Sequence, residues 1–217
     1  MLTRDLISHS IPYLHLDDTV FHALQLMNDY HVEHLPVVAE DKYIGIISEE
    51  QLLHSDDDDL LEQLPISDGK SVQANDHFLK AIQIAVQNNL SIVPVIEENS
   101  ILGSVTYTDL LRNASDFMSL NNPGGLIVLE IEAKDYSINE LNRIVESNDA
   151  QITQLNSFTD PETGIIQVTI RINKVEISDI ISTLQRYEYS IKYYFGEELY
   201  ENELRSNYDN LMHYLKI

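Results

Sequence analysis

The sequence predicts an α+β protein in which two tandem βαββα repeats precede a ferredoxin-like βαββαβ domain. Two observations lead to this prediction. The first half of the chain repeats one pattern at a spacing of 58 residues, and the second half follows a different order of strand-like and helix-like patterns. The stretches IGIISEEQLLHS (44–55) and LGSVTYTDLLRN (102–113) are equivalent parts of the two copies, with Gln51 where the second copy has Asp109.

The repeat holds its register without a gap. Pro36 and Pro94 are 58 residues apart, and so are Gly45 and Gly103. Each copy also carries an apolar stripe with the i, i+3, i+4, i+7 spacing of an amphipathic helix. The stripes are Val20, Ala23, Leu24 and Met27 in the first copy, and Phe78, Ala81, Ile82 and Ala85 in the second. Each copy therefore has the order βαββα, with leading strands expected in IPYLHL (11–16) and KSVQAN (70–75).

Two local features refine this prediction. Asp18 and Asp76 come just before the two stripes, where we expect each carboxylate to accept hydrogen bonds from free backbone N–H groups at the helix start. Pro36 and Pro94 lie inside strand-like runs, and proline cannot donate to a neighbouring strand. We therefore expect an edge position or an irregular pairing at each proline.

After Asn113 the pattern changes. The stretch SLNNPGG (119–125) has the composition of a linker, and apolar residues alternate in 127–131 and 166–172 as in strands. Ser137 with Glu140 predicts a capped helix start, and Asn173 with Glu176 predicts another. Further strands are expected near 150–158 and 190–195, which completes an antiparallel sheet with two helices on one face. Beyond it, an amphipathic C-terminal helix is predicted from Leu204, Tyr208, Leu211 and Leu215.

Composition excludes several classes of function. The formal net charge of −23 disfavours binding to nucleic acid and to anionic membrane surfaces. No apolar run approaches the roughly 20 residues that span a bilayer. The absence of cysteine excludes thiol chemistry and fits a cytoplasmic location. No P-loop, GxSxG or HExxH motif is present, so we expect no enzyme.

Two groups of residues could suggest a metal site, but we expect neither to bind a metal. The acid run 56–59 is interpreted as a solvated loop rather than a divalent-cation site. His31, Glu33 and His34 lie at a helix-to-strand junction, where their spacing gives no converging geometry. No metal site is predicted.

The paired βαββα units, the apolar-x-Pro-Val strand and the Gly-x-x-Thr-x-x-Asp segment at 103–109 together resemble the CBS-domain pair, or Bateman module, over residues 1–114. By strand order alone, the second half resembles an ACT-type regulatory domain. The combination is similar to bacterial acetoin-utilisation CBS proteins. The organisation expected from this resemblance is CBS repeats at 1–60 and 61–118, a linker at 119–125, an ACT-like domain at 126–196 and a C-terminal helix at 197–217.

The resemblance implies a module that binds an adenosine ligand such as AMP, ADP, ATP or S-adenosylmethionine, with no required cofactor. An ionised carboxylate can accept hydrogen bonds from both hydroxyls of a ribose, and Asp109 is the one acid in the motif. Thr106 could serve a ribose or phosphate oxygen near a helix N-terminus. Arg112 is the nearest cation, interpreted either as a phosphate contact or as a solvated or acid-paired side chain.

By the same resemblance, adenine would pack near Ile66 and against Val93 and Pro94. In the first copy the position of the acid is held by Gln51, which has no charge and one acceptor oxygen. We therefore predict one competent site, around Asp109. The alternative for Asp109 is an ordinary acid at a helix start.

The function predicted is that of a non-enzymatic, homodimeric, cytoplasmic regulator that binds an adenosine ligand. A structural dimerisation module with a decayed pocket is one alternative, and an amino-acid sensor acting through the ACT-like domain is another. Amino-acid-binding ACT domains usually present a glycine in the loop after the first strand, whereas EAKDYSI (132–138) has none. Sheet-to-sheet dimerisation is therefore the expected use of that domain.

Overall fold

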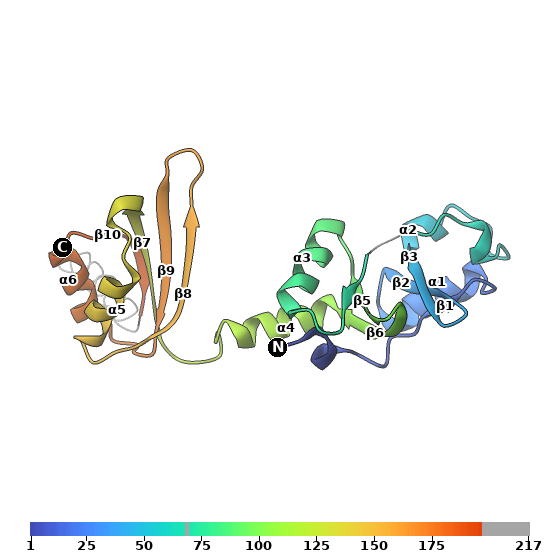
Figure 1. The fold of residues 1–217 in the computed structure, drawn as a ribbon, viewed down its shortest axis with the longest axis horizontal. Helices are drawn as coiled ribbons and strands as arrows, with labels where there is room; N and C mark the ends of the chain where they lie inside the picture. Colours follow the sequence, from blue (N-terminus) through green and yellow to red (C-terminus); the bar gives the residue numbers. More distant parts are fainter. Residues whose placement is uncertain (68–69, 197–217) are drawn as a thin grey trace, which may run out of the picture. The chain divides into compact units, whose positions relative to one another are not determined.

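The computed structural model describes residues 1–67 and 70–196, and these fall into two compact units that meet between Ala114 and Ser115 (Figure 1). The first unit contains two βαββα copies, as predicted, and every element of the second copy begins 58 residues after its equivalent. The first copy consists of β1 (Leu14–His15), α1 (Val20–Tyr30), β2 (His34–Ala39), β3 (Lys42–Ser48) and α2 (Glu49–Leu52). The second consists of β4 (Val72–Gln73), α3 (Phe78–Asn88), β5 (Ile92–Glu97), β6 (Ser100–Thr106) and α4 (Tyr107–Phe117).

The strands of this unit follow the order β1-β2-β3-β6-β5-β4, in which each copy contributes one half. The pairing of β2 with β3 shifts register between Val37 and Val38, and that of β5 with β6 shifts between Val95 and Ile96. Both irregularities follow the strand prolines closely, so the expected irregular pairing is confirmed.

The segment that precedes each copy in the sequence pairs with the other copy. The N-terminal segment pairs with the second copy, since Leu2 bridges to His77 and Ser8 bridges to Ser104. The segment between the copies pairs with the first, where Ser67 bridges to Ile46. We call residues 2–8 and 61–67 the lead-in segments. The second copy is completed by residues 2–8, which precede the first copy in the sequence, and the first copy is completed by residues 61–67, which follow its own last helix.

The prediction that Asp18 and Asp76 cap the helices is wrong. The Asp18 carboxylate accepts from the His15 N–H at 2.7 Å, and the Asp76 carboxylate accepts from the Gln73 N–H at 2.9 Å. The helix caps are the next residues, Thr19 for α1 and His77 for α3. Each acid lies one residue too early to reach the helix N–H groups, so it closes the turn between strand and helix instead.

The second unit has the predicted ferredoxin-like order. Its sheet order is β10-β7-β9-β8, all antiparallel, and α5 and α6 pack on one face over an apolar core (Figure 1). The elements are β7 (Gly125–Glu132), α5 (Ile138–Glu146), β8 (Ile152–Thr159), β9 (Ile165–Ile172), α6 (Ser178–Arg186) and β10 (Ser190–Phe195). The core comes from alternate strand residues and from one stripe of each helix, notably Ile127, Leu129, Leu141, Ile144, Val168, Ile170, Ile180 and Leu184.

One of the two predicted helix starts in this unit is confirmed. Ser137 caps α5 by accepting from the Glu140 N–H at 3.3 Å. The start predicted from Asn173 is wrong, because its side chain accepts from the Gln151 N–H at 2.8 Å and α6 begins only after Ile177. The helix predicted for 197–217 lies outside the described residues. Within 1–67 and 70–196, no helix is long and apolar enough to cross a membrane.

The two copies of the first unit are joined by a hydrogen-bonded junction at Ser91. Its hydroxyl accepts from the Glu33 N–H at 3.0 Å, and its own N–H donates to His34 Nδ1 at 3.3 Å. The Ser91 hydroxyl also lies 3.2 Å from the same ring nitrogen. Burial lowers the pKa of the half-buried His34 imidazole, and this effect outweighs the opposing influence of Glu33.

This junction predicts a pH-dependent loss of stability. The folded protein binds a proton on His34 less tightly than the unfolded chain does, so the free energy of unfolding falls as the pH drops from about 6.5 towards the lower folded pKa. His34→Asn keeps an acceptor near Ser91 and cannot titrate. Urea unfolding between pH 7.5 and 5 should therefore give this variant a shallower pH dependence than the parent, by at most about 1.4 kcal/mol per pH unit.

The exposed His9→Asn is the matched control, and it should keep the parent slope. Equal slopes for His34→Asn and the parent would contradict a titrating role for this junction.

Candidate functional site

The predicted motif residues of the second copy form one hydrogen-bonded cluster at the start of α4. The Thr106 hydroxyl donates to Asp109 Oδ2 at 2.6 Å and accepts from the Asp109 N–H at 3.0 Å. Arg112 Nη1 donates to Asp109 Oδ1 at 3.0 Å. The Asp109 side chain is 27% exposed and that of Arg112 is 68% exposed. An ion pair this open to water adds little stability, so Arg112 can leave it at small cost.

The backbone at this helix start is largely occupied. The Tyr107 N–H donates to the Ser91 carbonyl at 2.9 Å, and the Asp109 N–H is taken by Thr106. Two of the N–H groups that a phosphate could have used therefore already have acceptors. The carboxylate is the more available group, because a carboxylate offers about four acceptor positions and the cluster fills two.

The lead-in residue beside this motif is Ile7. A Cβ placed on Gly103, whose φ is +149°, would lie only 2.5 Å from Ile7 Cγ2. The Ser8 N–H donates to the Ser104 carbonyl at 2.9 Å, which holds the lead-in segment against β6. Glycine at 103 is what allows this close approach.

Ile66, predicted to line the Asp109 site, lies elsewhere. It packs with the core of the first copy, and a Cβ on Gly45 would lie 2.5 Å from Ile66 Cγ2. Ile66 therefore has the same position beside Gly45 that Ile7 has beside Gly103. The sequence carries a signal for this, because Ile-Ser occurs at 7–8 and again at 66–67. The spacing is 59 rather than 58, so the strict register of the repeat misses it.

Val93 and Pro94 lie on opposite faces of β5. Val93 is fully buried in the core of the second copy. Pro94 pairs with Ser104 of β6, and strand alternation puts Ser104 on the same face as Thr106. The Ser104 hydroxyl is buried and has no hydrogen-bond partner among the described residues. A polar side chain in this buried position, where the first copy has Ile46, was not singled out by the sequence analysis.

In the first copy, both the oxygen and the nitrogen of the Gln51 side-chain amide are hydrogen-bonded within the protein. Its Oε1 accepts from the Ser48 N–H at 3.0 Å and lies 3.1 Å from the Ser48 hydroxyl. Its Nε2 donates to the Pro65 carbonyl at 3.0 Å, which fastens α2 to the lead-in segment. An aspartate could not donate to that carbonyl. Gln51 and Asp109 therefore occupy equivalent positions with different contacts.

The acid run of the first copy contributes through its backbone. The Asp59 carbonyl accepts from the Val20 N–H at 2.9 Å, and the Asp57 carbonyl accepts from the Phe21 N–H at 3.0 Å. These bonds satisfy the start of α1, which otherwise has free donors. In the described part of the chain, no group of three or more histidine and acidic side chains is placed to hold a metal ion.

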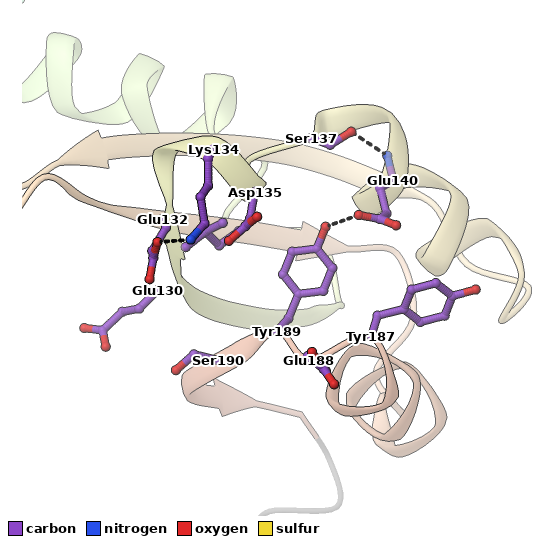
Figure 2. Close-up of a pocket in the computed structure, with 11 residues that line it drawn as sticks. Glu130, Glu132, Lys134, Asp135, Ser137, Glu140, Tyr187, Glu188, Tyr189 and Ser190 are labelled. Carbon is purple, nitrogen blue, oxygen red and sulfur yellow. Dashed lines mark hydrogen bonds and ion pairs between the residues drawn. The ribbon is translucent and has the colours of Figure 1, made fainter.

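The second unit contains a cavity of about 580 Å³ between the end of β7, the start of α5 and the start of β10 (Figure 2). The Tyr189 hydroxyl points towards Glu140 and donates to its carboxylate at 2.8 Å. Burial and this hydrogen bond raise the pKa of Tyr189. Lys134 is already paired with Glu132 at 2.8 Å. The other charged groups of the lining are Asp135 and Glu188, while the Glu130 side chain points away from Tyr189 and pairs with Lys192 at 2.9 Å. This acidic lining is unfavourable to the carboxylate of an amino acid.

Three solved structures are similar to about half of this chain. A CBS domain pair/ACT domain protein from Thermotoga maritima is 21% identical, over 54% of this chain and 99% of that chain, with a TM-score of 0.50. A candidate acetoin utilization protein from Vibrio cholerae is 20% identical, over 56% and 95% of the two chains, with a TM-score of 0.49. A structure of CBSX2 in complex with AMP is 16% identical, over 54% and 98%, with a TM-score of 0.47.

Comparison with protein families identifies the repeats. A model of the CBS domain matches the chain twice, over residues 4–58 and 61–116. The two matches together span more than half of the chain, and they fall on the two βαββα copies described above. The chain therefore belongs to the CBS domain family and carries the domain as a tandem pair.

Proposed function

We propose that this protein is a non-enzymatic, cytoplasmic regulator whose CBS pair binds an adenosine ligand (AMP, ADP, ATP or S-adenosylmethionine) at a single site around Asp109. CBS domain pairs commonly bind such ligands and have regulatory roles. The observation that carries the proposal is the Asp109 carboxylate, held at the start of α4 by Thr106 with part of its surface exposed. The second unit would transmit the binding event or support a homodimer.

The chemistry of Asp109 suits a ribose. Two vicinal hydroxyls can donate to the two oxygens of one carboxylate through short, charge-assisted bonds. Thr106 fixes one oxygen and leaves that oxygen a further acceptor position. Arg112 is exposed enough to turn from Asp109 to a phosphate, which would leave Oδ1 to the sugar.

Ser104 supports a ligand on the same face. A buried hydroxyl without a partner costs about 1–3 kcal/mol, and native proteins leave few such groups. Ser104 precedes Thr106 on the same face of β6, next to Pro94 and the Ser8 segment. A polar atom of a bound ligand would satisfy this hydroxyl.

The first copy supports a single site rather than two. Gln51 is neutral, and its amide already binds Ser48 and Pro65. A ligand there would have to break the Pro65 bond and would find no charge in return. Occupancy of the second copy alone would then shift the balance between arrangements of the module, provided that the ligand binds those arrangements unequally.

The first test replaces the carboxylate. Adenosine ligands at about 100 times their dissociation constant should stabilise the parent by about 2.7 kcal/mol, visible as a rise in Tm. Asp109→Asn keeps an acceptor for Thr106 but loses the charge and one acceptor oxygen. Titration of AMP, ADP, ATP and S-adenosylmethionine by calorimetry should show about tenfold to several hundredfold weaker binding to this variant.

Asp58→Asn is the control, because it removes the same charge from an exposed position in the same unit. It should bind as the parent does. If no adenosine compound raises Tm, the module is structural and its pocket has decayed. A response to amino acids alone would place sensing in the second unit.

A second test concerns the closure of the first copy. Gln51→Glu keeps an acceptor for the Ser48 N–H but sets a carboxylate oxygen against the Pro65 carbonyl. The free energy of unfolding should fall by about 1–3 kcal/mol in urea titrations, because a hydrogen bond becomes a repulsive contact. Binding of the adenosine ligand should stay unchanged.

Gln63→Glu is the matched control, since it adds the same charge at an exposed position nearby. Equal destabilisation by the two substitutions would mean that added charge, and not the bond to Pro65, determines the effect.

A further inference from the structure

The face of β6 that carries Thr106 also carries a buried serine, Ser104. Thr106 pairs with Ile92 of β5, and Ser104 pairs with Pro94, so all four side chains lie on the same face of the sheet. Ile92 belongs to the apolar cluster of the first copy, whereas its neighbour Val93 belongs to that of the second. The four residues therefore face away from the core of their own copy, and we call them the motif face.

The Ser104 hydroxyl is an unsatisfied polar group on the motif face. Ser104 is 0% exposed, and its hydroxyl has no hydrogen-bond partner among the described residues. Half-buried Ser91 differs, because its hydroxyl accepts from the Glu33 N–H at 3.0 Å. A hydroxyl that loses water without gaining a partner destabilises the folded protein. The first copy has Ile46 at the equivalent position, so the fold accepts an apolar residue there without this penalty.

We propose that Ser104 contacts the base of the bound nucleoside and selects for its 6-amino group, an inference that rests on the adenosine ligand proposed above. Asp109 and Thr106 would hold the ribose at the end of β6. Ser104 lies two residues back along the strand, about 7 Å from Thr106. The 6-amino group is at the edge of adenine that lies furthest from the ribose. A base that extends back along β6 therefore brings this group to the Ser104 hydroxyl.

The neighbours of Ser104 on the motif face suit the flat surfaces of a purine. Ile92 and Pro94 are both buried and apolar. The hydroxyl between them can accept a hydrogen bond from an amino group and donate one to a ring nitrogen. Binding sites for small molecules commonly combine apolar walls with a few placed polar groups of this kind. Ser104 is covered in the free protein, so neighbouring side chains must move as the base enters, and such movements are common on binding.

The opposite orientation of the ligand, with its 5′ substituent at Ser104, is unfavourable. A phosphate there would lie beside the apolar Ile92 and Pro94, where removing its charge from water is costly. Arg112 lies on α4, which begins where β6 ends, and is therefore on the other side of Thr106 along the chain. The base is thus assigned to Ser104, and the 5′ substituent to the side of Arg112.

Adenosine and purine riboside provide the test, because they share the ribose and differ only in the 6-amino group. In calorimetric titrations of the full chain, the parent should bind adenosine about five- to tenfold more tightly than purine riboside. Ser104→Ala should bring this ratio below about twofold, since the variant and the analogue remove the same hydrogen bond. Ser100→Ala removes a hydroxyl from an exposed position on the same strand, and it should keep the parent ratio.

A second measurement needs no ligand. Ser104→Ala should raise the Tm of the free protein by about 2–4 °C, because it removes a buried hydroxyl that has no partner. Ser91→Ala is the contrasting variant, and it should lower Tm because it breaks the bond from the Glu33 N–H. A higher Tm together with weaker adenosine binding is expected of a residue that serves binding at the expense of stability.

Three results would overturn this inference and leave the proposed function standing. They are equal affinities of the parent for the two nucleosides, an affinity ratio that Ser104→Ala leaves unchanged, and a lower Tm for Ser104→Ala without ligand. Asp109→Asn tests the proposed function separately, because loss of the carboxylate should weaken the binding of both nucleosides alike. If no adenosine compound binds the parent, the proposed function is wrong, and the role of Ser104 is wrong with it.

Discussion

The close approach of each lead-in segment to a glycine is the constraint on which the first unit depends. A Cβ at 45 would lie 2.5 Å from both Ile66 Cγ2 and the Ser67 carbonyl oxygen, and a Cβ at 103 would lie 2.5 Å from Ile7 Cγ2, so a side chain at either position would force its lead-in segment to shift or repack. Those segments hold the two copies together, because each pairs with β3 or β6 just before the motif helix. The motif glycine therefore acts on the site indirectly, by bringing the lead-in backbone alongside β6, two residues before Thr106.

The same architecture gives the two motif positions different uses. At the start of α4, the acid is tied to its own cap residue and to an exposed arginine, which leaves acceptor capacity at the surface. At the start of α2, the Gln51 amide nitrogen donates a hydrogen bond to the Pro65 carbonyl of the lead-in segment. One copy keeps a charged group available while the other converts the equivalent position into a structural bond. The exchange of a single residue type is sufficient for this difference, because a side-chain amide can donate to a carbonyl and an ionised carboxylate cannot.

Much of this organisation can be predicted from the sequence. The order of the elements follows from periodicity, and the register of the repeat predicts where every element of the second copy begins, although α4 runs on to Phe117 while α2 ends at Leu52. The position of Ile7 could not be predicted in the same way, since the lead-in segments are 59 residues apart and the N-terminal one pairs with the second copy rather than with the copy that follows it. The roles of Asp18 and Asp76 depend on whether the helix begins one or two residues later, and the sequence pattern does not determine this. The unpartnered hydroxyl of Ser104 depends on how a strand packs on both faces, and this is a property of the folded chain.

The exchange of lead-in segments has a consequence for what counts as one repeat. In the order of the sequence, each copy is preceded by a lead-in segment and ends with its motif helix. In space, the stretch from Leu2 to Ser8 belongs with the second copy, and the stretch from Leu61 to Ser67 belongs with the first. The covalent connection between the copies is thus itself a part of the first copy's sheet. The two copies are therefore completed in different ways: the first takes its lead-in from the residues that follow it, whereas the second depends on residues from the start of the chain.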